Sequence, residues 1–185
     1  SSTIEESIES FLSLNKIDVL ALSIIQYTSG ILIDFSFLNR IKEKYPKLLI
    51  IGDGTQFLGA HPFNFSNAPF DIVVGSGYKW LMAGFGNGVL IVSEKYLEQT
   101  KITPSFLYSH IFKGHFNILA TASLRFAIEA FNRQDFKALM EQKAQITSAV
   151  KARLVSLQLI APWVIERPSH SSIFNIPGNE SLYQK

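Results

Sequence analysis

Three short apolar runs divide the first half of the chain. They cover residues 18–25, 48–54 and 71–77, and each ends in small or polar residues. Runs of this length that are apolar at nearly every position are typical of strands in a parallel sheet with helices on both faces. The pattern therefore predicts three parallel strands. Residues 88–98 are expected to add a further strand, followed by the start of a helix.

A helical pattern lies between the first two runs. In residues 34–46 the apolar side chains fall on one face of a helix, and three consecutive charged side chains fall on the other. Asp34 is suited to cap the N-terminus of this helix, and Pro46 marks its end. The strand–helix–strand order predicts a right-handed crossover between parallel strands.

The pattern changes in the second half of the chain. Residues 118–131 and 136–157 repeat apolar positions at spacings of three and four, which predicts two long helices. Two strands of a new sheet are expected in residues 161–178. The expected fold class is α/β, a mainly parallel sheet flanked by helices. Residues 1–113 would be part of a large domain, and residues 114–185 a helical connection and the beginning of a smaller α+β domain.

Composition excludes several classes of protein. With 47% hydrophobic and 17% charged residues, the chain is predicted to be globular rather than disordered. Its net charge of only +2 predicts neither nucleic acid nor an anionic membrane as a partner. The chain has no cysteine, no signal-like N-terminus and no apolar run long enough to cross a bilayer, so a cytoplasmic location is expected.

Polar side chains follow each of the three predicted parallel strands. In chain order they are Gln26, Tyr27, Asp53, Gln56, Ser76, Tyr78 and Lys79. In open parallel α/β sheets, ligands bind beyond the carboxyl ends of the strands. We therefore expect a carboxylate, an amide, hydroxyls and an amine to converge on one crevice.

This set of groups suits pyridoxal 5′-phosphate. A pyridine ring used as an electron sink needs a carboxylate such as that of Asp53 at its nitrogen, and a lysine such as Lys79 to form a Schiff base with its aldehyde. Apolar neighbours are expected to desolvate Lys79 in part, which favours the uncharged, nucleophilic amine. Ser76, Gly77 and Tyr78 offer donors for a phosphate. Asp53 by itself also fits a simple helix N-cap.

Residues 53–65 and 71–92 resemble the core of the class V aminotransferase-like enzymes, which use this cofactor. The resemblance rests on Asp-x-x-Gln, then Ser-x-Tyr-Lys, with Gly-rich sequence after the lysine. Residues 26–35 and the downstream helical region also resemble the family, so the likeness spans nearly the whole chain. The GYKWL form is most similar to the kynureninase-like and isopenicillin-epimerase-like branch, whereas cysteine desulfurases usually have histidine where Tyr78 stands.

The resemblance implies a role for each matching residue. Asp53 would pair with the pyridinium nitrogen, and Gln56 would hydrogen-bond the phenolic oxygen of the ring. Ser76 and Tyr78 would hold the phosphate. Lys79 would form the Schiff base and then move a proton at the α-carbon of the substrate, so it is the expected catalytic residue.

The resemblance leaves two positions open and implies further partners. Either Gln26 or Tyr27 would touch the ring oxygen or the substrate. In the family a Gly-Thr pair near the domain connection reaches the phosphate of the neighbouring subunit, but residues 114–117 read GHFN here. His115 therefore replaces the threonine and is a departure from the family pattern. A homodimer acting on a small amino-acid substrate is implied.

Some family elements are expected outside this sequence, and we expect the chain to be a fragment. The Gly-rich phosphate loop and the aromatic residue that stacks on the ring should precede Ser1, and the arginine for the substrate carboxylate should follow Lys185. Transamination, desulfuration, hydrolytic side-chain cleavage and racemisation share the residues named above. The reaction therefore stays open, with a kynureninase-like or cysteine-desulfurase-like lyase or hydrolase among the alternatives.

Two interpretations from other classes of protein also fit the sequence. One is a non-catalytic scaffold with the same fold, and the other is an α/β nucleotide-binding domain in which Asp53 and Lys79 coincide by chance. The GFGNG sequence at 84–88 precedes a strand instead of opening a helix, so it is misplaced for a dinucleotide fingerprint. No metal site is predicted, because the four histidines lack metal-ligand spacing; they are His61, His110, His115 and His170.

Overall fold

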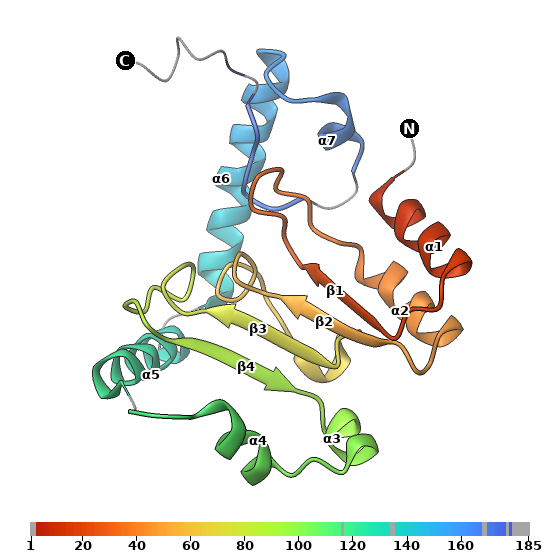
Figure 1. Ribbon diagram of the computed structural model, residues 1–185. Helices are drawn as coiled ribbons and strands as arrows, with labels where there is room; N and C mark the ends of the chain where they lie inside the picture. The colour runs from red at the N-terminus through yellow and green to blue at the C-terminus, as the bar shows by residue number, and fades with distance from the viewer. Residues whose placement is uncertain (1–2, 116, 134–135, 168–169, 177, 179–185) are drawn as a thin grey trace.

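The computed structural model describes residues 3–115, 117–133, 136–167, 170–176 and 178 (Figure 1). One four-stranded sheet forms the centre of the fold. Its strands are β1 (Val19–Ser23), β2 (Leu49–Asp53), β3 (Ile72–Ser76) and β4 (Gly88–Val92). The helices are α1 (Ile4–Leu14), α2 (Phe35–Lys44), α3 (Glu94–Thr100), α4 (Pro104–Ile111), α5 (Ile118–Arg133), α6 (Phe136–Ser156) and α7 (Pro162–Glu166), with a short 3₁₀ turn, η1, at Phe65–Asn67.

The strands lie in the order β1-β2-β3-β4. β1, β2 and β3 run parallel, as predicted, and β4 returns antiparallel to β3 along one edge. Ser23 pairs with Asp53, and Asp53 pairs with Val74. The carboxyl ends of the three parallel strands therefore lie together at one edge of the sheet, as the apolar runs indicated.

The predicted crossover helix is α2. The Asp34 side chain caps it by accepting a hydrogen bond from the backbone N–H of Ser36 at 2.8 Å. The helix ends at Lys44, just before Pro46, as expected. The predicted long helices at 118–131 and 136–157 are confirmed as α5 and α6.

The core lies on one face of the sheet. Ile50 and Val73 point into it and pack with Leu12 of α1 and Leu38 of α2. The other face is covered less tightly, and alternate residues on it, such as Val74, are exposed. A strand has a side-chain period of two, so one packed face and one open face give this alternation.

Residues 161–178 differ from the prediction of two strands. Residues 162–166 form α7, whose Val164 is almost fully buried, and no strand occurs in the described part of this segment. Ser171 donates its backbone N–H to the Gly30 carbonyl at 3.1 Å. Gly30 has φ 71°, and a Cβ at this position would collide with the Ile173 carbonyl. The segment is thus held against the turn that follows β1.

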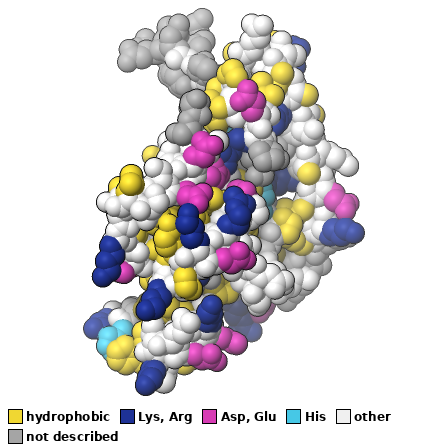
Figure 2. All heavy atoms as spheres, turned by 90° about the vertical axis from the view of Figure 1, so that its right-hand side faces the viewer, with side chains coloured by type: hydrophobic (Ala, Val, Ile, Leu, Met, Phe, Trp, Pro, Cys, Tyr) yellow, Lys and Arg dark blue, Asp and Glu magenta, His cyan; other side chains and the backbone are white. Residues whose placement is uncertain are grey.

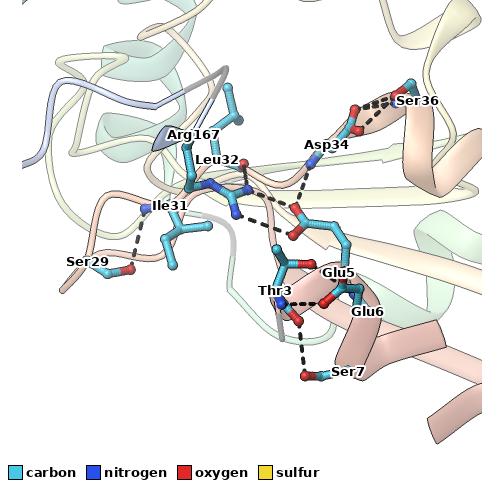
Figure 3. Close-up of polar contacts among 10 residues, drawn as sticks. All are labelled: Thr3, Glu5, Glu6, Ser7, Ser29, Ile31, Leu32, Asp34, Ser36 and Arg167. Atoms are coloured by element: carbon cyan, nitrogen blue, oxygen red, sulfur yellow. Dashed lines mark hydrogen bonds and ion pairs between the residues drawn. The ribbon is translucent and has the colours of Figure 1, made fainter. Parts of the chain in front are cut away.

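An ion pair joins the two ends of the described chain (Figure 3). The guanidinium of Arg167 donates to both carboxylate oxygens of Glu5, at 2.8 and 3.3 Å, and also to the Leu32 carbonyl at 2.9 Å. Burial raises the pKa of Glu5, but the hydrogen bonds and the charge of Arg167 outweigh that effect, and the pKa lies below its usual value. This contact holds α1 and the segment after α7 against the loop that carries Leu32.

A second ion pair, between Lys42 and Asp71, lies at the end of the sheet where β2 and β3 begin. Asp71 is only 6% exposed, and its Oδ2 accepts from Lys42 Nζ and from the backbone N–H of Ile50 at 2.8 Å. Lys42 also donates to the Leu48 carbonyl at 2.7 Å. The pair therefore connects α2 to the starts of β2 and β3.

Charged side chains of both signs are mixed over the face of the molecule that carries α1, α2 and α3, as Figure 2 shows. This mixture agrees with the small net charge. No helix in the described part of the chain is long and apolar enough to cross a membrane.

The imidazole ring of His61 packs against the hydrophobic core. It stacks on Phe57 with 5.4 Å between ring centres and an angle of 5° between the rings. Burial, and to a smaller extent the charge of Lys143, lowers the pKa of His61 from 6.5 to about 4.

We expect the free energy of unfolding to fall as the pH drops from 7 towards 4. In this range the unfolded chain binds a proton at position 61 that the folded chain does not, so stability rises with pH. The loss in the free energy of unfolding should be on the order of 1 kcal/mol. This is less than the whole pKa shift would give, because the ring is only partly buried and solvent screens it. Urea unfolding at pH 7 and pH 5 measures it.

The comparison that isolates His61 is His61→Phe, which keeps the ring stacking and removes the titrating group. Its stability should depend less on pH than that of the wild type. His110→Gln, at an exposed position, is the matched control and should follow the wild type. Equal pH dependence in all three proteins would contradict the assignment to His61.

Candidate active site

The predicted site residues Asp53 and Ser76 lie on the same face of the sheet. Asp53 ends β2 and pairs with Val74, and Ser76 is two residues farther along β3, which returns it to that face. Both line a hollow of about 660 Å³ over the open face, bordered on its far side by Leu107 and Tyr108 of α4. We call this the strand-end hollow.

Hydrogen bonds from backbone N–H groups hold these two strand ends together. Asp53 Oδ1 accepts from the N–H of Thr55 at 2.9 Å, and Thr55 Oγ1 accepts from the N–H of Ser76 at 3.3 Å. The Gly54 N–H donates to the Val74 carbonyl at 2.7 Å. Asp53 caps a turn here and no helix follows it, so the plain helix N-cap reading does not apply. One carboxylate oxygen, Oδ2, is left for a ligand.

Gln56 is positioned by Trp80. The indole N–H of Trp80 donates to Gln56 Oε1 at 2.9 Å, and both side chains are half-buried. This bond fixes the amide oxygen, so the amide N–H groups are the donors that Gln56 has to offer. The sequence by itself indicated no role for Trp80. The signal for this role was an indole donor directly after the candidate lysine.

Lys79 lies in the turn that follows β3, and its side chain is exposed. Its Nζ lies 5.3 Å from the centre of the exposed Tyr78 ring, which stacks on Phe85 at 5.0 Å. The expected desolvation of Lys79 is therefore not found. The apolar neighbours point elsewhere, since Val73 faces the core and Trp80 turns to Gln56.

The glycine-rich sequence after Lys79 has a structural role. Asn87 donates from Nδ2 to the carbonyls of Gly84 and Ala120, at 2.7 and 2.9 Å, which connects this loop to α5. A Cβ on Gly77 would collide with Asn87 Oδ1, so the turn before Lys79 requires glycine. Sequence reasoning missed Asn87, because the partner that connects it to α5, Ala120, is distant along the chain.

The remaining candidates lie outside the strand-end hollow. Gln26 is exposed in the turn after β1, where its Oε1 accepts from the Thr28 N–H at 3.3 Å, and Tyr27 beside it is 68% exposed. His115 is exposed between α4 and α5. The structure thus brings Asp53 and Ser76 into one hollow. The other candidates do not line it: Gln26, Gln56, Tyr78, Lys79 and His115.

Comparison with known proteins gives one family. The family described as "Aminotransferase class-V" matches residues 2–181. No curated protein matches the sequence with significance.

Solved structures share the fold at low sequence identity. Alanine–glyoxylate aminotransferase from Nostoc sp. has a TM-score of 0.68 and 15% identity, and the match covers 84% of this chain and 45% of that one. The apo cysteine desulfurase from Thermococcus onnurineus NA1 has a TM-score of 0.68 and 18% identity, covering 88% and 45%. Ureidoglycine–glyoxylate aminotransferase from Bacillus subtilis has a TM-score of 0.66 and 14% identity, and the match covers 83% of this chain and 43% of that one. The chain spans less than half the length of these proteins.

The match covers nearly the whole chain, and the architecture agrees with it. A mixed sheet flanked by helices is the fold of these neighbours, so the predicted aminotransferase-like fold is confirmed. The cofactor that the family implies is pyridoxal 5′-phosphate. The chain belongs to the class V aminotransferase family.

Proposed function

We propose that this chain provides the cofactor face of a pyridoxal-phosphate-dependent enzyme that acts on a small amino acid. The observation that carries the proposal is that Asp53 and Ser76 line one strand-end hollow. They lie 23 residues apart along the chain, and Thr55 hydrogen-bonds to both. This cofactor needs an acceptor for its protonated ring nitrogen at one end and a donor for its phosphate at the other.

The residues present fit the cofactor's chemistry. When bound, pyridoxal 5′-phosphate supplies an aldehyde that reacts with a primary amine and a ring that withdraws electrons. Asp53 has Oδ2 free to hold the proton on the ring nitrogen, and Gln56 has amide N–H groups for the phenolic oxygen. Ser76 and Tyr78 would hold the phosphate with their hydroxyls.

Lys79 would act as the reactive amine. It would form the Schiff base with the cofactor and then carry a proton to or from the α-carbon of the substrate. Gln26, on the neighbouring strand end, would contact the ring oxygen or the substrate. His115 would stand where the family has a threonine for the phosphate of a second subunit.

A homodimer is part of the proposal. The surface around Lys79 exposes large apolar side chains, among them Met82 at 78% and Phe85 at 81%, and surfaces of this kind are typical of interaction sites. A second subunit over this surface would also remove Lys79 from water, which the described chain does not do. The cytoplasm is the proposed location of this dimer.

Cofactor titration tests the proposal directly. The protein would be titrated with pyridoxal 5′-phosphate, and the visible absorption band of the bound cofactor recorded before and after addition of a panel of amino acids. A saturable band that one amino acid changes, with turnover, supports the enzyme. A protein that stays colourless at saturating cofactor would refute it.

A non-catalytic scaffold is the second candidate, and the exposure of Lys79 favours it. Such a protein would bind the cofactor through Asp53 and Ser76 but process no amino acid. Cofactor binding without change on addition of any amino acid, in the dimeric protein, would select the scaffold over the enzyme.

Replacing Trp80 by phenylalanine is expected to weaken cofactor binding. The change removes one hydrogen bond to Gln56, and a bond of this kind contributes about 0.5–1.5 kcal/mol, which corresponds to roughly a 2- to 10-fold rise in Kd. Absorption titration measures the Kd. In the Gln56→Ala background the same change should have little further effect, whereas equal effects in both backgrounds would show that Trp80 acts independently of Gln56.

A further inference from the structure

A second hollow, of about 670 Å³, lies beside α6 on the far side of the turn after β2. Its walls are the turn at residues 60–62, one side of α6 and the segment at residues 170–172. It shares no lining residue with the strand-end hollow. Figure 1 shows α6 rising beside the ends of β1 and β2. We call it the α6 hollow.

Lys143 is the central cation of the α6 hollow. Its Nζ donates to the Ala60 carbonyl at 2.6 Å and lies 5.3 Å from the centre of the Trp80 ring. No carboxylate of the described residues pairs with it, and burial alone lowers its pKa. An ammonium that is partly shielded from water and has one hydrogen-bond acceptor has two N–H groups left to donate.

His61 provides a second unsatisfied group. Its Nε2 is buried and has no hydrogen-bond partner among the described residues. A buried polar atom without a partner costs free energy, so the position is favourable for an acceptor brought by a ligand. Lys143 and His61 line the same hollow, and His61 Nε2 can donate to an occupant in the tautomer that carries its proton there.

The charge and the walls of the hollow define the class of ligand. Lys137 and Lys151 add positive charge, and the one carboxylate on the wall, Glu141, lies 3.9 Å from Lys137 at the exposed rim. His170 and the hydroxyl pair Thr147–Ser172 complete the polar side. The rest of the lining is apolar, with Phe136, Met140, Ala144 and Pro62.

We propose that the α6 hollow binds a small organic carboxylate, with the carboxylate on Lys143 and His61 and an apolar body against α6. Two donors match the two oxygens of a carboxylate, and the apolar wall suits a hydrocarbon or aromatic group. Because Lys143 also lies over Trp80, which donates to Gln56, an occupant would be linked to Gln56 through two side chains, those of Lys143 and Trp80.

Histidine proton NMR with benzoate as the probe tests this proposal. The chain has four histidines, of which His61 and His170 line the α6 hollow and His110 and His115 do not. Histidine-to-glutamine variants assign the four imidazole signals. Benzoate at pH 7 is expected to shift the signals of His61 and His170 with one saturating curve and to leave the other two in place.

Two variants make the test specific. Lys143→Met should weaken benzoate binding at least about 10-fold, the loss expected when a charged hydrogen-bond donor worth about 1.5–3 kcal/mol is removed. Lys113→Met, at an exposed position outside the hollow, is the matched control and should bind as the wild type does. His61→Phe, which keeps the ring stack, should also weaken binding and serves if Lys143→Met does not fold.

Three results would overturn the proposal. They are equal shifts of all four histidines, inorganic phosphate producing the shifts while benzoate produces none, and benzoate binding unchanged in Lys143→Met or His61→Phe. The test does not depend on bound cofactor, so its outcome is separate from that of the proposed function.

Discussion

Lys79→Ala is expected to abolish turnover and covalent attachment of the cofactor together. Loss of a group that transfers the proton at the substrate alone costs about 10²–10⁴-fold in rate, and loss of the reactive amine adds to this. Non-covalent binding should persist, because Asp53 and Ser76 remain in the strand-end hollow.

The measurement has two parts. Borohydride reduction of the cofactor-loaded wild type, followed by peptide mapping, should find the cofactor on the peptide that carries Lys79, and the variant should give no labelled peptide. Lys95→Ala, at an exposed position of α3, is the control and should behave as the wild type does. Labelling of a different lysine, or full activity in Lys79→Ala, would refute the role of Lys79.

Asp71→Ala is expected to lower the free energy of unfolding by about 3–5 kcal/mol, the range measured when one partner of a buried ion pair is removed. The change leaves the Lys42 ammonium with only the Leu48 carbonyl, and it leaves the backbone N–H of Ile50 without its acceptor. This is a large share of the 5–15 kcal/mol typical of a folded domain.

Urea unfolding followed by circular dichroism measures this loss. Asp71→Asn retains an acceptor for Ile50 and should be less damaging than Asp71→Ala. The matched control is Glu9→Ala, which breaks the exposed Lys44–Glu9 pair and should leave the unfolding midpoint unchanged. If Asp71→Ala and Glu9→Ala had the same midpoint, the ion pair at the start of β3 would not contribute as argued.

The predicted sheet and its crossover helix were accurate because they depend on local pattern. Apolar runs of strand length, the spacing of apolar residues in α2 and the cap at Asp34 are all encoded within a few residues. For the same reason the sequence led to Asp53 and Ser76, since polar residues after parallel strands meet at one edge. The roles of all the candidates stay predictions: Gln26, Asp53, Gln56, Ser76, Tyr78, Lys79 and His115.

The short segment after α6 shows where local pattern is insufficient. Residues 162–166 are apolar enough for a strand or a helix, and periodicity does not distinguish the two over so few positions. Pro162 at the start of α7 and the burial of Val164 decide for the helix. The exposure of Lys79 was missed because neighbours along the chain, such as Val73, need not be neighbours in space.

The sequence by itself determined the strands of the central sheet, the long helices and the family-like order of polar residues at the strand ends. Only the tertiary structure decided the contacts between distant residues, such as Glu5 with Arg167, Gln56 with Trp80, and His61 with Lys143 in one hollow. Hydrogen bonds and burial depend on which surfaces pack together, and that is a property of the whole folded chain rather than of any short stretch of it.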